Sequence, residues 1–259
     1  MIGELLLLSG NDIPFPEAQV TVHQPTLKEI AYIGEDTFFI GCGFLDFSKN
    51  LLGETDKIRL SNYNDFDIFM SIMKNSSQDT TRSIEAAFLV LTLIFPLYEV
   101  SVRDMNIVLK QNEKEFYINR TNFEEFKKII STMFSLKLGA HENESYNPSG
   151  DMAKRIAEKF KKRHDKLNQL TKGASEGGKK ISILQRYASI LAVGLQKDLN
   201  CLMQYTVYQI YDEFQRFQLK VQWDAYIQAR MAGAKDLEEV DNWMIDLREQ
   251  GKQKNKTKK

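Results

Sequence analysis

The first part of the chain alternates short stretches with strand-like or helix-like spacing of hydrophobic and polar positions. Val20–His23 alternates as a half-buried strand does. Residues 24–34 have Pro25 in the first turn, apolar positions along one helix face and Gly34 at the end, which predicts a short helix. Residues 37–47 are too apolar for the surface. Their two glycines fit a helix or a bulged strand, and we favour the helix.

Two longer helices are predicted next. Ser61–Asp65 offers several capping side chains before an apolar stripe with three- and four-residue spacing. Thr80 or Thr81 then caps a helix that Pro96 ends, because proline lacks a backbone donor and clashes with the preceding turn. This second helix is apolar on nearly all sides, so we expect it at the centre of the N-terminal domain.

Strand patterns and one more helix complete the N-terminal unit. Residues 98–102 and 107–118 have strand patterns, and a polar turn within the second stretch makes it a hairpin. Asn122 and Glu125 have the spacing of a capping box, and the apolar positions up to Met133 define an amphipathic helix that returns over the hairpin. The unit is therefore predicted to mix helices and strands.

The predicted fold class is α+β: a small N-terminal α+β domain with a short β-hairpin, followed by a mostly helical C-terminal region. The α+β domain spans residues 1–138. Residues 139–180 begin with turn formers and continue as a basic, exposed helix, so we interpret them as a linker. Residues 181–247 form a helical domain, and the Lys-rich residues 248–259 form a disordered basic tail.

The predicted C-terminal helices carry a surplus of aromatic residues. These recur at every third position, at Tyr205, Tyr208, Tyr211, Phe214 and Phe217. Three-residue spacing drifts by about 60° per step around an α-helix, so the rings spread over more than one face. Core packing is the first interpretation, and a docking surface is the alternative. Gly233 is placed to end this helix, and Asp236 with Glu239 to begin a last one.

The composition is that of an ordinary globular chain of one or two domains: of 259 residues, 42% are hydrophobic and 27% are charged. It excludes a disordered chain, a disulfide-stapled scaffold and nucleic-acid binding through a large positive net charge. The 35 basic and 35 acidic residues balance only in sum, because residues 1–150 carry a net charge of −8 and residues 151–259 of +8. Such asymmetry indicates different neighbours for the two halves or head-to-tail contact between copies, which leaves self-association open.

The sequence gives no indication of secretion or of a membrane span. Residues 1–8 have an acidic residue where a signal peptide has basic ones, and we predict a first strand there. The longest apolar run, residues 86–98, is shorter than the roughly 20 residues that a membrane span requires. Cys42 and Cys201 lie too far apart in sequence for a metal knuckle, and they fit a reducing compartment.

One stretch matches a phosphate-binding motif out of context. Residues 173–180 contain the G-x-x-x-x-G-K core of a P-loop. A basic helix precedes them instead of a buried strand, and Lys180 occupies the position of the Ser or Thr that binds magnesium. We therefore interpret them as a glycine-rich basic linker.

No other residue set defines a catalytic, cofactor or metal site. His23 and Cys42 are the residue types of a base and a thiol nucleophile, but nothing in the sequence places them together. His141 and His164 lack the spacing of zinc ligands. We expect no enzyme activity, no cofactor and no metal.

The basic segments leave a nucleic-acid-binding accessory protein as a minor alternative. Residues 151–180 and 248–259 are rich in Lys and Arg, which neutralise phosphates. No recognition motif or interleaved aromatic residues accompany them. This favours a solvated linker or an acidic protein partner.

Three stretches of the chain share a family pattern. They are HQPTLKEIAYIGE at 23–35, LSNYNDFDIF at 60–69, and the end of the chain from YDEF at 211–214 through MAGAK at 231–235 to NWM at 242–244. Together they resemble tail assembly chaperones and related tail or baseplate assembly proteins of long-tailed bacteriophages. The likeness spans most of the chain and includes no catalytic signature.

The resemblance implies a non-enzymatic protein of the infected bacterial host's cytoplasm, which shields the tape measure protein and brings tail tube subunits to it. An α+β head, a basic linker and an aromatic-rich helical tail suit a protein that holds a partner with each end. On this hypothesis the candidate partner-binding residues are Tyr205, Tyr208, Phe214, Trp223 and Trp243. The alternative is a structural component of the phage baseplate or tail.

Overall fold

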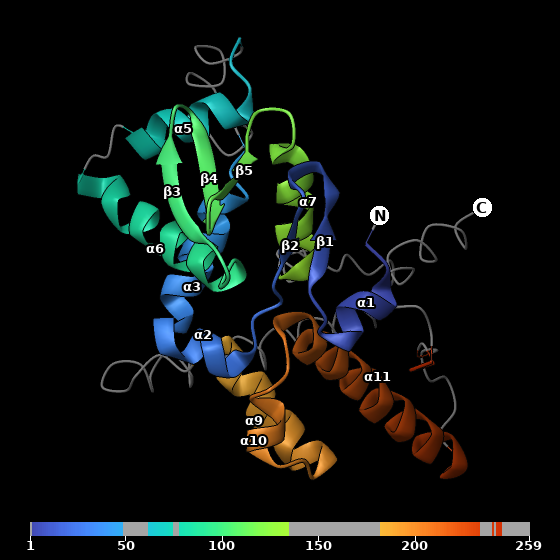
Figure 1. Cartoon of the computed structure of the whole chain (residues 1–259). Coiled ribbons are helices and arrows are strands. Elements are labelled where there is room, and N and C mark those ends of the chain that lie inside the picture. Colours follow the sequence, from blue (N-terminus) through green and yellow to red (C-terminus); the bar gives the residue numbers. More distant parts are fainter. Residues whose placement is uncertain are drawn as a thin grey trace.

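The structure is a computed structural model with a mixed α+β fold, as the hydrophobic pattern predicts (Figure 1). The residues that it describes are 2–48, 62–74, 78–134, 182–233, 240 and 242–244, with the backbone alone for 78–80. The predictions for 139–180 and 248–259, the P-loop-like stretch included, lie outside the described residues. Of the last helix, predicted to begin at Asp236, the structure describes only Val240 and Asn242–Met244, and Trp243 and Met244 form a turn.

The N-terminal part combines helices with two small sheets. Its elements are α1 (Glu4–Ser9), β1 (Ile13–Phe15), the 3-10 helix η1 (Pro16–Ala18), β2 (Val20–Val22), α2 (Leu27–Ile33), α3 (Glu35–Leu45), α5 (Asp65–Lys74), α6 (Gln78–Ile94), β3 (Glu99–Arg103), β4 (Asn106–Gln111), β5 (Lys114–Ile118) and α7 (Phe123–Met133). The named elements of the described C-terminal part are α9 (Ile183–Leu195), α10 (Leu199–Leu202) and α11 (Val207–Met231).

Most predicted elements are confirmed. The stretches predicted as β2, α2, α3, α5, the three strands β3 to β5 and α7 all form those elements. The helix predicted to be capped by Thr80 or Thr81 begins earlier, at Gln78. Because the backbone before these two threonines is already helical, neither of them caps the helix.

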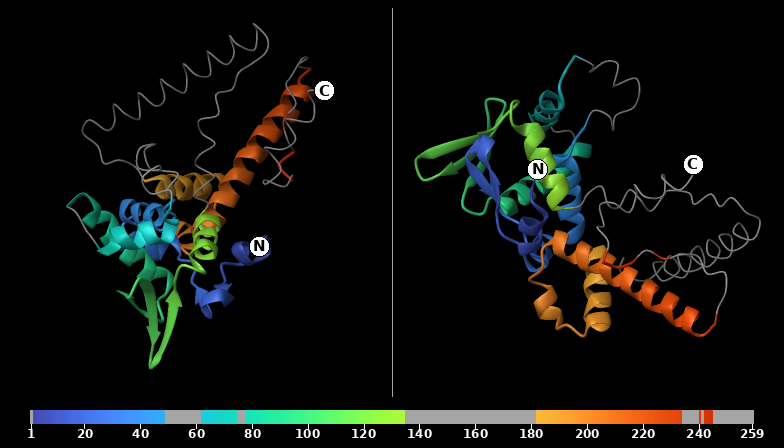
Figure 2. Two further views of the ribbon diagram at one scale, coloured as in Figure 1. Left: turned by 90° about the horizontal axis from the view of Figure 1, so that it is seen from above. Right: turned by 90° about the vertical axis from the view of Figure 1, so that its right-hand side faces the viewer.

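Both sheets are antiparallel. β1 pairs with β2, and the second sheet has the order β3-β4-β5, so β3 and β5 are its edge strands. The ribbon of β1 and β2 lies beside α7 (Figure 1). The larger sheet extends outward from the layers of helices (Figure 2).

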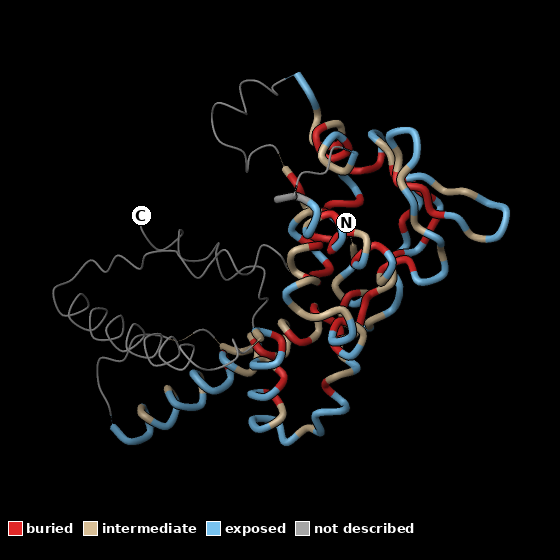
Figure 3. Tube along the Cα trace, turned by 90° about the vertical axis from the view of Figure 1, so that its left-hand side faces the viewer, coloured by how far each residue is buried: buried red, intermediate tan, exposed pale blue. Residues whose placement is uncertain are grey.

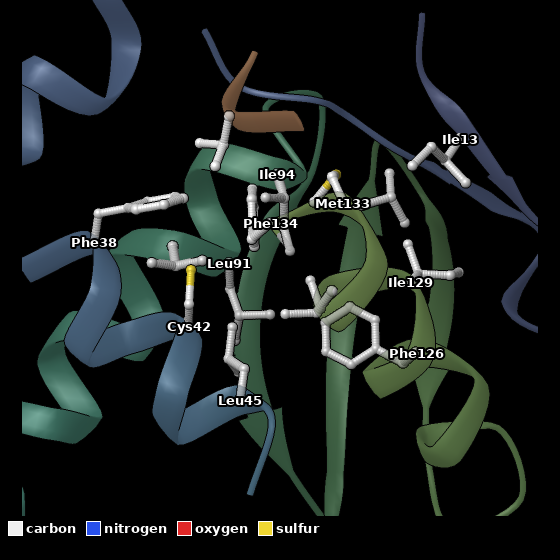
Figure 4. Packing of buried hydrophobic residues seen from close by; sticks show 14 of the residues in the cluster. Ile13, Phe38, Cys42, Leu45, Leu91, Ile94, Phe126, Ile129, Met133 and Phe134 are labelled. Carbon is white, nitrogen blue, oxygen red and sulfur yellow. The ribbon is translucent and has the colours of Figure 1, made fainter. Parts of the chain in front are cut away.

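The core lies between α3, α6 and α7, which meet through fully buried side chains. Figure 4 shows Phe38, Cys42 and Leu45 of α3 facing Leu91 and Ile94 of α6, with α7 on the other side. The rings of Phe38 and Phe134 pack edge to face, with centroids 4.8 Å apart. Residues of α9, α10 and α11 belong to the same hydrophobic cluster, namely Leu184, Ala188, Leu191, Leu202, Val207, Ile210 and Phe214. One apolar core therefore joins the two ends of the described chain.

The prediction of a first strand over residues 1–8 is wrong, because residues 4–9 form α1. Within this helix only Leu7 is buried, and Leu5 is 80% exposed. A strand would place these two leucines on the same face. Gly10 ends the helix in the left-handed conformation with φ of 71°, which glycine adopts without strain.

The capping box predicted at Asn122 is also wrong. Asn122 precedes α7, but its side chain makes no capping hydrogen bond to that helix. Its Nδ2 donates to the carbonyl oxygens of Glu17 in η1 and Tyr117 in β5, and its Oδ1 accepts from the backbone N–H of Asn119. The buried Asn122 amide thus forms hydrogen bonds with three backbone groups. A side chain that capped α7 would satisfy fewer of them.

Candidate functional site

Three of the five candidate partner-binding residues, Tyr208, Phe214 and Trp223, lie on α11, a helix of 25 residues. Thr206 and Gln209 start it with a reciprocal capping box: the Gln209 N–H donates to Thr206 Oγ1 over 3.3 Å, and the Thr206 N–H donates to Gln209 Oε1 over 2.8 Å. Gln209 Nε2 also donates to the carbonyl oxygen of Leu8 at the end of α1, over 2.7 Å. The first turn of α11 is therefore fixed to the N-terminal part.

The start of α2 repeats this arrangement. Thr26 and Glu29 form the same box, and both the N–H and the hydroxyl of Thr26 donate to Glu29 Oε2 over 2.7 Å. Partial burial alone would raise the pKa of Glu29, but these bonds and the contact with His23 outweigh it and lower that pKa. The sequences around the two boxes, QPTLKEI at 24–30 and QYTVYQI at 204–210, are related by the pattern Q-x-T-[LV]-x-[EQ]-I. This short repeat is not among the motifs predicted above, and an alignment of the chain with itself reveals it.

The two boxes lie against each other. Thr26 and Thr206 form an antiparallel β-bridge. The backbone N–H groups of Leu27 and Lys28 donate to the carbonyl oxygens of Tyr205 and Met203, over 2.8 and 2.9 Å. This backbone junction joins α2 to the turn that precedes α11.

A carboxylate of the N-terminal part also fixes α9. Glu35, the first residue of α3, accepts hydrogen bonds at Oε1 from the backbone N–H groups of Ile183 and Leu184, over 2.7 and 3.2 Å. A carboxylate at a helix N-terminus satisfies free backbone donors and complements the helix dipole. The helix that supports α11 is thus attached to the same body as α11.

The proximal half of α11, residues 207–217, is held on several sides. None of its residues is exposed, and Val207, Ile210 and Phe214 are buried. The Phe214 ring stacks on Tyr187 of α9, with centroids 3.9 Å apart and an interplanar angle of 17°. This half of the helix is part of the core.

A polar network joins the proximal half of α11 to the loop between α9 and α10. Lys197 Nζ donates to Tyr205 Oη over 2.6 Å and to Glu213 Oε1 over 2.8 Å. Tyr205 Oη donates to the same Glu213 oxygen over 3.2 Å. Partial burial alone would lower the pKa of Lys197, but its hydrogen bonds to Glu213 and Tyr205 outweigh it and raise that pKa. The charged form of Lys197 is therefore favoured.

The distal half of α11, residues 218–231, projects from the body (Figure 2), and its trace is mostly exposed (Figure 3). Apart from Leu219, every residue in it is half-buried or exposed. Trp223 and Tyr226 lie with ring centroids 5.9 Å apart, and the guanidinium of Arg230 lies 5.7 Å from the Tyr226 ring. With Ile227 these residues define what we call the aromatic face.

The aromatic face does not continue the buried face of the proximal half. At about 100° per residue, the nine positions from Phe214 to Trp223 place the two side chains on opposite sides of the helix axis. Trp223, Tyr226 and Ile227 themselves fall within a sector of about 100°. The sequence therefore changes the apolar side of α11 where the helix leaves the body.

The structure separates the five candidate partner-binding residues. Tyr205 belongs to the Lys197 network, the hydroxyl of Tyr208 donates to Glu4 of α1 over 3.4 Å, and Phe214 lies in the core. Trp223 is half-buried on the aromatic face, and Trp243 is half-buried in a turn beyond α11. Their role in binding stays a prediction, and among those on α11 the geometry singles out Trp223.

His23 and Cys42 have separate surroundings. His23 Nδ1 lies 2.9 Å from Asp12 Oδ1, and its Nε2 lies 3.3 Å from Glu29 Oε1. Cys42 is fully buried in α3, where desolvation, with a contribution from Asp46, raises its pKa well above the ordinary value. Among the described residues, no group of three or more His, Cys, Asp or Glu is placed to hold a metal ion.

The length and hydropathy of a helix decide whether it could span a membrane. None of the helices in the described ranges is long and apolar enough to cross a bilayer.

Comparison with known proteins relates the C-terminal segment to phages. Residues 179–247 match the family described as the YomV second domain, which covers α9, α10 and α11. YomV is a protein of a Bacillus prophage region, and the function of its family is not established. No curated protein and no solved structure matches the chain. The segment that contains the aromatic face is thus similar to a domain of a prophage protein.

Proposed function

We propose that this protein is a non-enzymatic tail or baseplate assembly chaperone of a long-tailed phage. It acts in the cytoplasm of the infected bacterium, where it binds the tape measure protein and brings tail tube subunits to it. The similarity of residues 179–247 to a prophage protein domain supports a phage role. The resemblance of three stretches of the chain to tail assembly chaperones supports the specific role.

The observation that carries the proposal is the aromatic face of α11. Trp223, Tyr226 and Ile227 lie at i, i+3 and i+4, the spacing with which a helix enters an apolar groove or packs on another helix. Trp and Tyr dominate binding hot spots because they desolvate a large area with few rotatable bonds. A rigid, projecting helix with such a face suits a chaperone that covers apolar helix surface of the tape measure protein before assembly.

The anchoring of α11 supports the same role. The capping box at Thr206, the bridge to Thr26 and the Phe214–Tyr187 stack hold the proximal half firmly. A fixed base orients the aromatic face without the entropy cost of ordering a loop on binding. The distal half presents the partner with a preformed surface.

Co-purification with the tape measure protein of the same phage tests the docking role. Trp223→Ala removes the central ring of the aromatic face and is expected to weaken binding by about 2 kcal/mol or more. Val221→Ala is the matched control, because Val221 is half exposed on the other side of the same turn. Loss of binding in both variants, or in neither, contradicts docking through the aromatic face.

Mass spectrometry of purified phage particles tests the chaperone role against a structural one. An assembly chaperone leaves the particle, so its peptides are expected in lysates of infected cells and absent from mature virions. Peptides at the level of known tail proteins contradict the proposal and identify a tail or baseplate component.

A further inference from the structure

The strand β3 has an open edge whose geometry is fixed by the turn that follows it. β3 is an edge of the sheet β3-β4-β5. Asp104 and Met105 form a two-residue loop to β4, and both have positive φ, 49° and 60°. This is the backbone of a type I′ hairpin turn, which makes the flanking residues Arg103 and Asn106 a hydrogen-bonded pair.

Hydrogen-bonded and non-hydrogen-bonded pairs alternate along an antiparallel ladder. Since Arg103 is hydrogen-bonded to β4, so are Ser101 and Glu99, opposite Val108 and Lys110. The N–H and C=O groups of the two intervening valines, Val100 and Val102, therefore point to the open edge. Over the described ranges, these two residues have no backbone–backbone hydrogen bond to a group outside the sheet.

The side chains of β3 divide between two faces. Val100 and Val102 are half-buried and pack against the hydrophobic core. Glu99, Ser101 and Arg103 are exposed on the outer face, where Arg103 forms an ion pair with Glu115 of β5. The strand is therefore symmetric in residue type about Ser101. A valine lies on each side of Ser101, and charges of opposite sign stand at the two ends.

We propose that β3 is a self-association edge, which pairs antiparallel with β3 of a second copy around a two-fold axis at Ser101. In this register Val100 lies opposite Val102 of the second copy, so the outward N–H and C=O groups of both valines form hydrogen bonds across the axis. Glu99 lies opposite Arg103 of the second copy, and the symmetry repeats this pair. The two sheets join into one sheet of six strands.

The charges select this register among those that the backbone permits. A two-fold axis at Val100 or at Val102 also pairs outward backbone groups. In neither case does Glu99 lie opposite Arg103 of the second copy. A slip by one residue places the valines opposite outer-face side chains. The axis at Ser101 alone joins both valine pairs and both pairs of opposite charge, which directly opposed cross-strand positions favour.

A second copy fits this edge better than an unrelated peptide, because the strand is complementary to itself. Edge strands usually carry charges that repel neighbouring edges. Here one charge of each sign stands at equal distance from the centre, so the same charges attract in the symmetric pair. Arg103 would then lie between Glu115 of its own chain and Glu99 of the second copy.

Charge reversal and mixing test the proposal on the full chain, with sedimentation velocity over a range of concentrations. The wild type is expected to show concentration-dependent dimers. Glu99→Arg and Arg103→Glu each place like charges opposite each other at two symmetric positions, and each is expected to weaken self-association roughly tenfold or more. Glu113→Arg, in the exposed β4–β5 turn, is the matched charge control and is expected to dimerise as the wild type does.

Mixing the two single variants separates pairing from folding. When Glu99→Arg meets Arg103→Glu, every position of the symmetric register again holds opposite charges, so heterodimers are expected to form at wild-type concentrations. Mixing alters neither chain's own fold. A wild type that stays monomeric at the highest attainable concentration overturns the proposal, and so does a mixture that associates no better than its components.

A backbone variant tests the hydrogen bonds. Val100→Pro removes an N–H that points away from β4, and proline is tolerated on an edge strand for that reason. The variant is expected to keep the thermal unfolding midpoint of the wild type within a few degrees and to lose dimerisation. Unaltered dimerisation places the contact elsewhere and overturns the proposal. If the proline ring prevents folding through its fixed φ, the mixture of Glu99→Arg and Arg103→Glu decides the outcome, because it tests the same register without a backbone change.

Discussion

The two halves of α11 belong to one helix and are both rich in aromatic residues, yet they make opposite use of them. In residues 207–217 no side chain is exposed, and Phe214 stacks on α9. In residues 218–231 only Leu219 is buried, and the Trp223–Tyr226 pair lies on the opposite side of the helix. Whether an aromatic residue of α11 lies in the core or on the aromatic face therefore depends on its angular position relative to the body, and composition does not decide it.

The largest expected effect compares the two aromatic positions directly. Phe214→Ala empties a core site and is expected to lower the free energy of unfolding by about 3–5 kcal/mol. Trp223→Ala removes a half-exposed ring and is expected to cost about 1 kcal/mol or less. Urea unfolding followed by circular dichroism measures both. Equal losses would mean that the distal half is packed as tightly as the proximal half.

The contact between α9 and the proximal half gives the next effect. A Cβ added at Gly194 would lie 2.2 Å from the Phe217 ring, so Gly194→Ala forces the ring to move and is expected to cost about 1–3 kcal/mol. At Gly43 of α3 nothing lies within 4 Å, and Gly43→Ala is expected to stabilise the helix by up to about 1 kcal/mol. Phe217→Leu in the Gly194→Ala background should recover part of the loss in thermal stability.

Removal of the cap at the base of α11 should have a smaller effect. Thr206→Ala deletes the acceptor of the Gln209 N–H and is expected to cost about 1 kcal/mol, within the range of helix N-caps. Thr206→Ser keeps the hydroxyl and serves as the control. Hydrogen exchange should show faster opening in the first turn of α11 in the alanine variant, with the distal half unchanged. Exchange that accelerates equally over the whole helix argues against a locally anchored base.

The smallest effect is a pH dependence of the proximal half. The pKa of Lys197 is raised above its ordinary value of 10.5, so its contribution to stability is complete below that pH and is lost as the pH rises through the raised pKa. Because Lys197 and Glu213 are about one third exposed, we expect less than about 1 kcal/mol. Lys197→Met should lose this alkaline decline in unfolding free energy, and Lys220→Met, in the exposed distal pair with Asp224, should keep it. A decline that is identical in the wild type and Lys197→Met contradicts the assignment.

Local signals predicted the elements whose ends are set by nearby residues. Helix α2 was predictable because Pro25 and Gly34 mark its two ends, and the hairpin of β4 and β5 because its apolar pattern stops at a polar turn. α1 was predicted wrongly because four leucines in a row fit either period, and only the rest of the fold decides which leucine is buried. The capping box predicted at Asn122 is wrong for a similar reason, because the hydrogen-bond partners of Asn122 in η1 and β5 are tertiary neighbours.

The candidate site was predictable only in part. The three-residue aromatic spacing correctly indicated rings on more than one side of the helix. It could not indicate which side α9 and α1 cover, because those contacts join residues far apart in sequence. Tyr205 and Tyr208 are candidate contacts by residue type, and in the structure their hydroxyls bond to Lys197 and Glu4 within the chain.

The junction of the two capping boxes also makes α11 a lever. At 1.5 Å per residue the helix is about 37 Å long, so a tilt of about 10° at Thr206 displaces its far end by about 6 Å. The bridge from Thr26 and the bond from Gln209 to Leu8 lie at the first turn of α11, where the helix would pivot. A small shift of these contacts therefore produces a larger displacement at the far end of the helix. A few hydrogen bonds at one end of the helix, together with the packing of its proximal half on α9, thus set the position of Trp223 in space.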